Sequence, residues 1–153
     1  MRTPQTRRPG LAGLLALLIL SLPLAACSDD EDAYCGALKA DQESFSEMQE
    51  DTTGLGLLKH RPTLARLAAK APEDLRDEWQ TFLGAIDAFS ETLDDVGVSP
   101  DDFADERPPA GLSATDRSRI ASAANELSSK DVVDAANGIE QHAKDVCKLQ
   151  LGL

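Results

Sequence analysis

Basic side chains are scarce in this sequence. Its 153 residues hold 15 lysines and arginines against 27 aspartates and glutamates, which gives a formal net charge of −12. A field of that sign repels the phosphates of nucleic acids and the head groups of anionic lipids. Nucleic-acid binding is therefore disfavoured, and we expect the folded part to be soluble and monomeric.

Recognisable catalytic and metal-binding patterns are also missing. The two histidines, His60 and His142, lie far apart and belong to no H-E-x-x-H or cysteine/histidine pattern. No G-x-S-x-G, S-x-x-K, P-loop or dinucleotide-binding glycine pattern occurs. The acids between Glu91 and Glu106 lack the spacing of a calcium-binding loop, which favours a solvated acidic face. We predict no metal, no cofactor and no enzymatic activity, although the many carboxylates leave chance catalytic pairs open.

No apolar run is long enough to span a bilayer as an ordinary helix, which needs about 20 residues. The longest run, 11–24, follows the basic segment 1–10 and precedes two alanines. This order is typical of a secretory signal peptide, so we predict that 1–26 is removed. Removal takes away three arginines and no acid, which leaves the mature chain at −15. Pro9 and Gly10 follow the paired arginines where a twin-arginine signal carries bulky apolar residues, which favours the general export route.

The end of this segment, Leu24-Ala25-Ala26-Cys27, resembles the lipobox of bacterial lipoproteins. In that family a diacylglycerol is attached to the cysteine sulfur, and a peptidase cuts just before it. The resemblance implies that Cys27 is the first mature residue and binds the protein to membrane lipid at the extracytoplasmic face. Two acyl chains anchor a protein stably, whereas one holds it only marginally. The alternative is an ordinary cleaved signal without lipid.

Lipidation of Cys27 would account for the odd number of cysteines. Cys35 and Cys147 then form one pair, near the start and the end of the mature fold. Export places them in an oxidising compartment, where a disulfide persists. Two unpaired buried thiols are the weaker alternative, and no C-x-x-C spacing supports a redox role.

The residues after Cys27 are predicted to form an acidic spacer (27–32 with the lipidated cysteine) and one all-α domain (33–153). No alternating strand pattern occurs. Antiparallel placement of the first and last helices by the disulfide predicts a small up-and-down bundle of four to five helices. Four of the expected helices cover about 33–49, 72–96, 114–127 and 129–149. A further short helix, between the first two, has Pro62 in its first turn and ends near Lys70.

The third of these helices has the clearest pattern. Its apolar residues recur at alternating steps of four and three along one face, and Gly97 is expected to end the helix. The stripe comprises Leu75, Trp79, Phe82, Ile86, Phe89, Leu93 and Val96. Core packing is the simplest role for Trp79, the only tryptophan. The last helix shows a second stripe, Val132, Ala136, Ile139, Ala143 and Val146.

Most of the chain resembles the small helical lipoproteins of high-GC Gram-positive, actinobacterial type. The shared features are the lipobox, Tyr34-Cys35 after the acidic stretch, Ala71-Pro72-Glu73-Asp74-Leu75 leading to Trp79, and Asp145-Val146-Cys147 near the end. The resemblance implies location and a helical fold, and assigns no catalytic residue. We expect a non-enzymatic, lipid-anchored module that binds a protein partner through its helical surface. The alternative is a carrier of a small apolar ligand or lipid in a cavity near Trp79 and Phe82.

Overall fold

A computed structural model describes residues 26–51, 55–103 and 107–153, with side chains described from Asp29 onward. Over these residues the chain is all-helical, without β-strands, and one disulfide joins its two ends. The predicted all-α class is therefore confirmed. The seven described α-helices are α1 (Ala26–Ala40), α2 (Gln42–Glu50), α3 (Gly56–Lys59), α4 (Arg61–Ala68), α5 (Arg76–Asp95), α6 (Ala114–Leu127) and α7 (Lys130–Asp145), and two 3-10 turns are η1 (Glu73–Leu75) and η2 (Pro100–Asp102).

The central element is α5, which contacts α3, α4, α6 and α7. Its predicted apolar stripe is buried from Leu75 to Leu93, and Val96 at its end is half-buried. Gly97 follows with a φ of +70°, a conformation that glycine adopts without strain, so the helix ends where predicted. Pro72 lies just before η1 in an extended conformation, and not inside the first helical turn.

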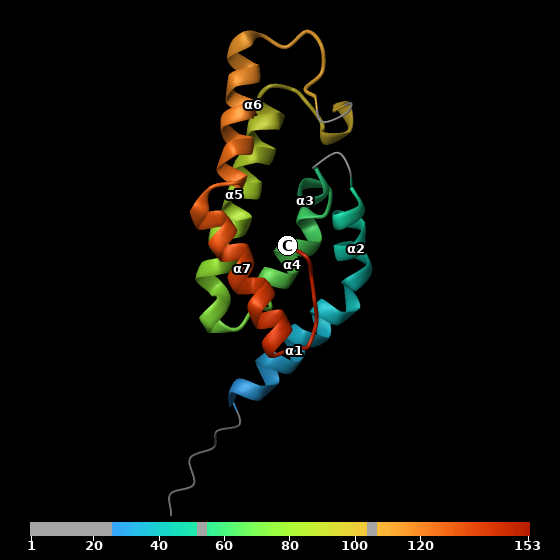
Figure 1. Ribbon diagram of the computed structural model, residues 1–153, viewed down its shortest axis with the longest axis vertical. Coiled ribbons are helices and arrows are strands. Elements are labelled where there is room, and N and C mark those ends of the chain that lie inside the picture. Colours follow the sequence, from blue (N-terminus) through green and yellow to red (C-terminus); the bar gives the residue numbers. More distant parts are fainter. Residues whose placement is uncertain (1–25, 52–54, 104–106) are drawn as a thin grey trace, which may run out of the picture.

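The helices α6 and α7 follow one another along α5. Figure 1 shows α6 above α7, both running downward, and both helices contact α5. The expected up-and-down bundle of four to five helices is not confirmed, because consecutive helices that run the same way do not alternate in direction. The predicted bounds of α6 are confirmed, and α7 begins after the cap Ser129, whose hydroxyl accepts a hydrogen bond from the Val132 amide.

The first predicted helix is two helices, and it begins earlier than expected. A break at Asp41 separates α1 from α2, and the acids Asp29–Asp32 lie inside α1 instead of forming a separate spacer. Both oxygens of Asp41 accept hydrogen bonds from the Arg66 guanidinium of α4, at 2.8 and 2.9 Å. This bidentate contact links the break to α4, because paired Arg–carboxylate bonds constrain both partners in orientation.

The segment between α2 and α5 is folded as two short helices. Pro62 lies in the first turn of α4, as predicted, where its missing N–H costs no helical hydrogen bond. Leu64 and Leu67 of α4 are fully buried, and α4 packs on both α1 and α5. On its outer side, the guanidinium of Arg61 pairs with the carboxylate of Asp87 on α5.

After α7 the chain turns back into the molecule. The helix ends at Asp145, four residues before the predicted end, so Val146 is 40% exposed and not part of the inward stripe. The Leu149 amide donates to the Ala143 carbonyl at 3.0 Å, and Leu151 is almost fully buried. Figure 1 shows the C-terminus near the centre of the molecule, between α7 and α2. The last residues therefore belong to the core.

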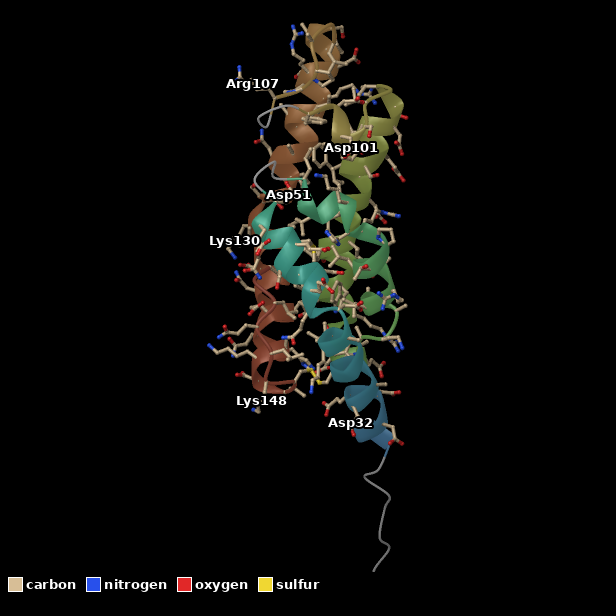
Figure 2. All side chains as sticks on the ribbon, turned by 90° about the vertical axis from the view of Figure 1, so that its right-hand side faces the viewer. Asp32, Asp51, Asp101, Arg107, Lys130 and Lys148 are labelled. Atoms are coloured by element: carbon tan, nitrogen blue, oxygen red, sulfur yellow. A yellow bond between two sulfur atoms is a disulfide. The ribbon has the colours of Figure 1, made fainter. Side chains whose placement is uncertain are left out.

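The disulfide joins Cys35 in α1 to Cys147 just after α7, with a Cα–Cα distance of 5.1 Å. This confirms the predicted pairing. Figure 2 shows Asp32 and Lys148 at the same end of the molecule, beside the yellow disulfide bond. Charged side chains point outward along the length of the molecule, and no charged side chain is buried among the described residues. None of the described helices has both the length and the apolar character to cross a membrane.

Candidate functional site

The two residues predicted to flank a ligand cavity, Trp79 and Phe82, are core residues. They are 1% and 3% exposed, and their rings meet edge to face at a centroid distance of 6.2 Å. The Trp79 indole N–H donates to the Tyr34 hydroxyl at 2.9 Å. With its only polar atom satisfied inside the protein, Trp79 fills space between helices, and neither residue lines the groove described next.

A large apolar depression lies between α6, α3 and the segment that follows η2. We call it the apolar groove; its volume is about 580 Å³. Ligand pockets in proteins are usually concave, mostly apolar and about 300–1,000 Å³ in volume. The groove is lined by Leu55, Leu57, Phe89, Phe103, Pro108, Arg117, Ile120, Ala121, Ala124, Leu127 and Ser128.

One face of α6 forms the long wall of the apolar groove. Its lining residues run from Arg117 to Ser128 at helical steps of three and four, so they share one side of the helix. Eleven steps along an α-helix rise about 16 Å, which is the span of the lining residues along α6. Phe89 of α5 belongs to the buried core as well as to the lining, and Leu55 and Leu57 come from the opposite side. The alanines of α6 leave the space that larger side chains would fill.

Arg117 is the only charged side chain that lines the apolar groove in the described part of the chain. Its guanidinium donates to the Leu112 carbonyl, and no described carboxylate pairs with it. Arg119, two residues along the same helix, instead pairs with Asp95 at 2.8 Å. A guanidinium has five N–H donors, so Arg117 keeps donors free for another acceptor. The groove thus combines an apolar wall with one cation that has no carboxylate partner among the described residues.

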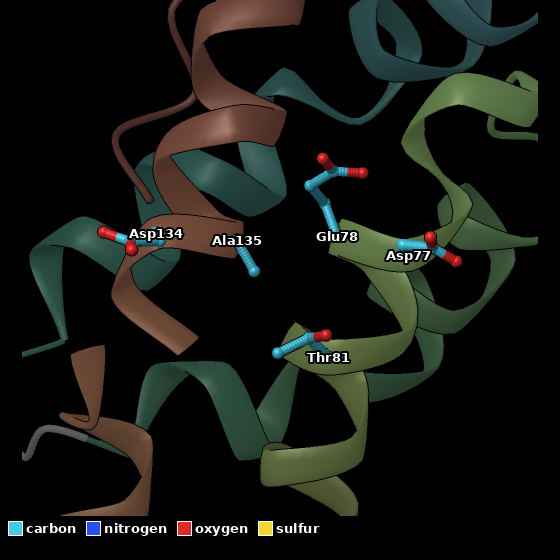
Figure 3. Close-up of a pocket in the computed structure, with 5 residues that line it drawn as sticks. All are labelled: Asp77, Glu78, Thr81, Asp134 and Ala135. Carbon is cyan, nitrogen blue, oxygen red and sulfur yellow. The ribbon is translucent and has the colours of Figure 1, made fainter. Parts of the chain in front are cut away.

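A second, shallower depression of about 230 Å³ lies between α5 and α7 and is mainly acidic. Figure 3 shows Asp77 and Asp134 pointing to opposite sides and Glu78 pointing along the helices, so the three carboxylates do not converge. Asp134 already pairs with Lys130. Among the described residues no group of three or more histidine, cysteine, aspartate or glutamate side chains is placed to hold a metal ion.

The histidines lie apart in the fold as well as in the sequence. His60, after α3, faces Glu47 of α2 with a nitrogen–oxygen distance of 3.6 Å. His142 is half-buried on α7, and its ring packs edge-on against Tyr34 at a centroid distance of 5.8 Å. Its Nε2 atom is buried without a hydrogen-bond partner in the described part of the protein. Both histidines therefore have packing or surface contacts, and neither joins the apolar groove.

The acidic stretch after α5 is used in capping and surface pairing. Asp102 accepts a hydrogen bond from the Ser99 amide at 2.7 Å, and the Ser99 hydroxyl accepts one from the Asp101 amide, which caps η2. Asp95 pairs with Arg119. Asp105 and Glu106 lie outside the described residues. The contacts that are described agree with a solvated acidic face.

Comparison with known protein families, curated proteins and solved structures finds no match to this chain. The site can therefore be interpreted only from its own residues. Of the predicted lipobox, Leu24 and Ala25 lie outside the described residues, and the side chains of Ala26 and Cys27 are not described. The sequence carried no signal for the apolar groove, because its walls come from segments that are far apart in the chain.

Proposed function

We propose that this protein is a non-enzymatic binding protein that holds a small apolar ligand in the apolar groove while a lipid on Cys27 anchors it outside the membrane. The groove is the observation that carries the proposal. It has the volume and apolar lining of a small-molecule site, and no catalytic pattern accompanies it in the sequence. Transfer of an apolar ligand from water to such a lining is favourable by about 25 cal/mol per Å² of surface buried.

The same structure gives less support to a protein partner docked on the outer helical surface. Docking sites are marked by contiguous exposed apolar patches, whereas single apolar side chains are common on any surface. The only exposed large apolar side chains among the described residues are Val133 and Val146, at separate places on α7. A binding role is therefore better placed in the apolar groove than on the outer faces of the helices.

The lipid anchor is supported by the motif and by the cysteine pairing. Cys35 and Cys147 bond to each other, so Cys27 has no partner of its own kind within the chain. It follows the apolar segment and two small residues, at the position where the lipobox of bacterial lipoproteins has its acylated cysteine. Export to the extracytoplasmic face is proposed on the same grounds.

The test of the groove is a blocking substitution. Ala124→Phe adds a ring to the lining of the groove, and Ser122→Phe adds the same ring to an exposed position of α6 that does not line it. We expect a fluorescent apolar dye to bind the parent protein and Ser122→Phe, and to bind Ala124→Phe at least about ten-fold more weakly, a change of about 1.4 kcal/mol. Circular dichroism and thermal melting confirm that each variant folds.

Equal binding of the dye to Ala124→Phe and Ser122→Phe, with both variants folded, would show that the dye binds elsewhere. Absence of saturable binding to the parent protein across dyes of different length would contradict the proposed function itself. Trp79 is unsuitable as a reporter, because it is buried in the core and does not line the groove.

A further inference from the structure

We infer, on the basis of the function proposed above, that the ligand of the apolar groove is a single-chain fatty acid whose carboxylate binds Arg117. Two observations point to this chemistry. One face of α6 lines the groove from Arg117 to Ser128, and Arg117, the only charged lining residue among the described residues, stands at one end of that face. A ligand that matches both features has one apolar chain and one anionic head.

The charge of Arg117 decides the sign of the head group. The protein has a net charge of −12, so a bare anion has no general attraction to it. Arg117 nevertheless has no described carboxylate partner, while Arg61, Arg66 and Arg119 each have one. A guanidinium matches a carboxylate in geometry and can donate two parallel hydrogen bonds to it. A fatty acid therefore supplies the carboxylate that Arg117 does not meet among the described residues.

The α6 side of the groove offers a path for one apolar chain. Its lining residues on α6 form a single row, Arg117, Ile120, Ala121, Ala124, Leu127 and Ser128. The row ends with the hydroxyl-bearing Ser128 and the cation at opposite ends, and alanine or aliphatic side chains fill the middle. A chain lying along this row places its apolar part on Ile120 and Leu127 while its head stays near the solvent. Apolar contact and charge pairing then act on different parts of one ligand.

The experiment compares three ligands of equal chain length: decanoate, decanol and decylamine. Binding is measured by titration calorimetry at mildly alkaline pH, where the carboxylate is ionised. The exported protein carries Cys27→Ala and is purified as the chain without 1–26, so that neither an acyl chain nor the apolar segment 11–24 competes for the groove. We expect decanoate to bind about ten-fold more tightly than decanol, because charge-assisted hydrogen bonds are stronger than neutral ones. Decylamine is expected to bind most weakly, since Arg117 repels its ammonium group.

Arg117→Gln is the deciding variant, and Arg119→Gln is its matched control on the same helix. Arg117→Gln should lower the affinity for decanoate to that for decanol and leave decanol unchanged, whereas Arg119→Gln should keep the preference. The inference is overturned if decanoate and decanol bind the parent protein equally, or if Arg117→Gln retains the preference. If Ala124→Phe does not weaken decanol binding, or if none of the three ligands binds, the proposed function fails together with the inference.

Discussion

Burial in the fold changes the pKa of the Tyr34 hydroxyl. Its side chain has no exposed surface, and burial raises its pKa to about 12, although the hydrogen bond from Trp79 lowers it. The unfolded chain releases this proton near pH 10, so between pH 10 and about 12 the folded state binds more protons than the unfolded state. Stability therefore falls with rising pH across this window, by up to about 2–3 kcal/mol from Tyr34 alone. Urea denaturation over an alkaline pH series measures the decline.

Tyr34→Phe separates this contribution from those of other groups. The variant lacks the ionisable hydroxyl, so its stability should fall less steeply over the same pH window. At neutral pH it should be less stable by about 1–3 kcal/mol, because the buried Trp79 N–H loses its acceptor. An equally steep alkaline decline in Tyr34→Phe would assign the effect to other groups.

The C-terminal tail, 148–153, acts as an element of the core although it has no regular secondary structure. The Leu151 and Gly152 amides both donate to the Glu140 carboxylate, at 3.0 and 2.8 Å, and the Leu151 carbonyl accepts from the Gln49 side chain at 2.7 Å. Leu151 itself is 1% exposed. We expect Leu151→Ala to lower the free energy of unfolding by about 2–5 kcal/mol, the usual range for a buried leucine. Urea denaturation measures the loss.

Val133→Ala is the control for this prediction. Val133 is 45% exposed, so its truncation should lower the free energy of unfolding only slightly.

Gly152→Ala tests the tail in a different way. Gly152 has a φ of +72°, and an added Cβ would lie 2.2 Å from the Gln49 amide nitrogen, so the substitution should destabilise the tail without removing an apolar side chain. If Leu151→Ala proves as mild as Val133→Ala, the tail does not contribute to the core in solution.

At the scale of elements, local sequence signals predict where helices lie and where they end. They do not predict the contacts between segments that are distant in the sequence. The stripe of α5 and the bounds of α6 follow from periodicity and from serine and glycine at helix ends. The break at Asp41 is bridged to Arg66, which lies 25 residues away, and the sequence around Asp41 contains no helix breaker. The tail after Cys147 has no helical period that would mark Leu151 as buried. The apolar groove joins Leu55, Phe89 and Ile120, which no local pattern connects.

At the scale of the molecule, the disulfide ties α1 to the end of α7 across a sequence separation of 112 residues. Cross-linking restricts the unfolded chain, and a loop of about 100 residues is worth about 4–5 kcal/mol in the chain-entropy model. We expect reduction to lower the free energy of unfolding by this amount, which a shift of the urea midpoint to lower concentration measures. The double variant Cys35→Ser, Cys147→Ser should resemble the reduced protein and should not respond to reductant. A response of that variant to reductant would point to an effect outside this bond.

The proposed anchor and the apolar groove lie toward opposite ends of the molecule. Figure 1 shows α1 beginning at the lower end of the molecule and α6 lying at the upper end. The disulfide joins Cys35 of α1 to the end of α7, and the residues from Arg117 to Ser128 line the apolar groove at α6. A lipid on Cys27 would attach at the lower end, since α1 begins at Ala26. The anchored protein would then hold the apolar groove away from the bilayer surface. Its ligand would enter from the extracytoplasmic space and not directly from the membrane below it.

Cys27→Ala tests the anchor and this separation of functions together. Loss of two acyl chains removes about 0.8 kcal/mol for each buried methylene, so variant chains from which 1–26 has been removed should leave the membrane fraction and appear in the extracytoplasmic soluble fraction. Because the groove lies at the other end of the molecule, binding of the apolar dye should be unchanged. Ser28→Ala, at the neighbouring position, should stay membrane-bound with its dye binding intact. Retention of Cys27→Ala in the membrane, with processing as in the parent protein, would contradict lipidation at this cysteine.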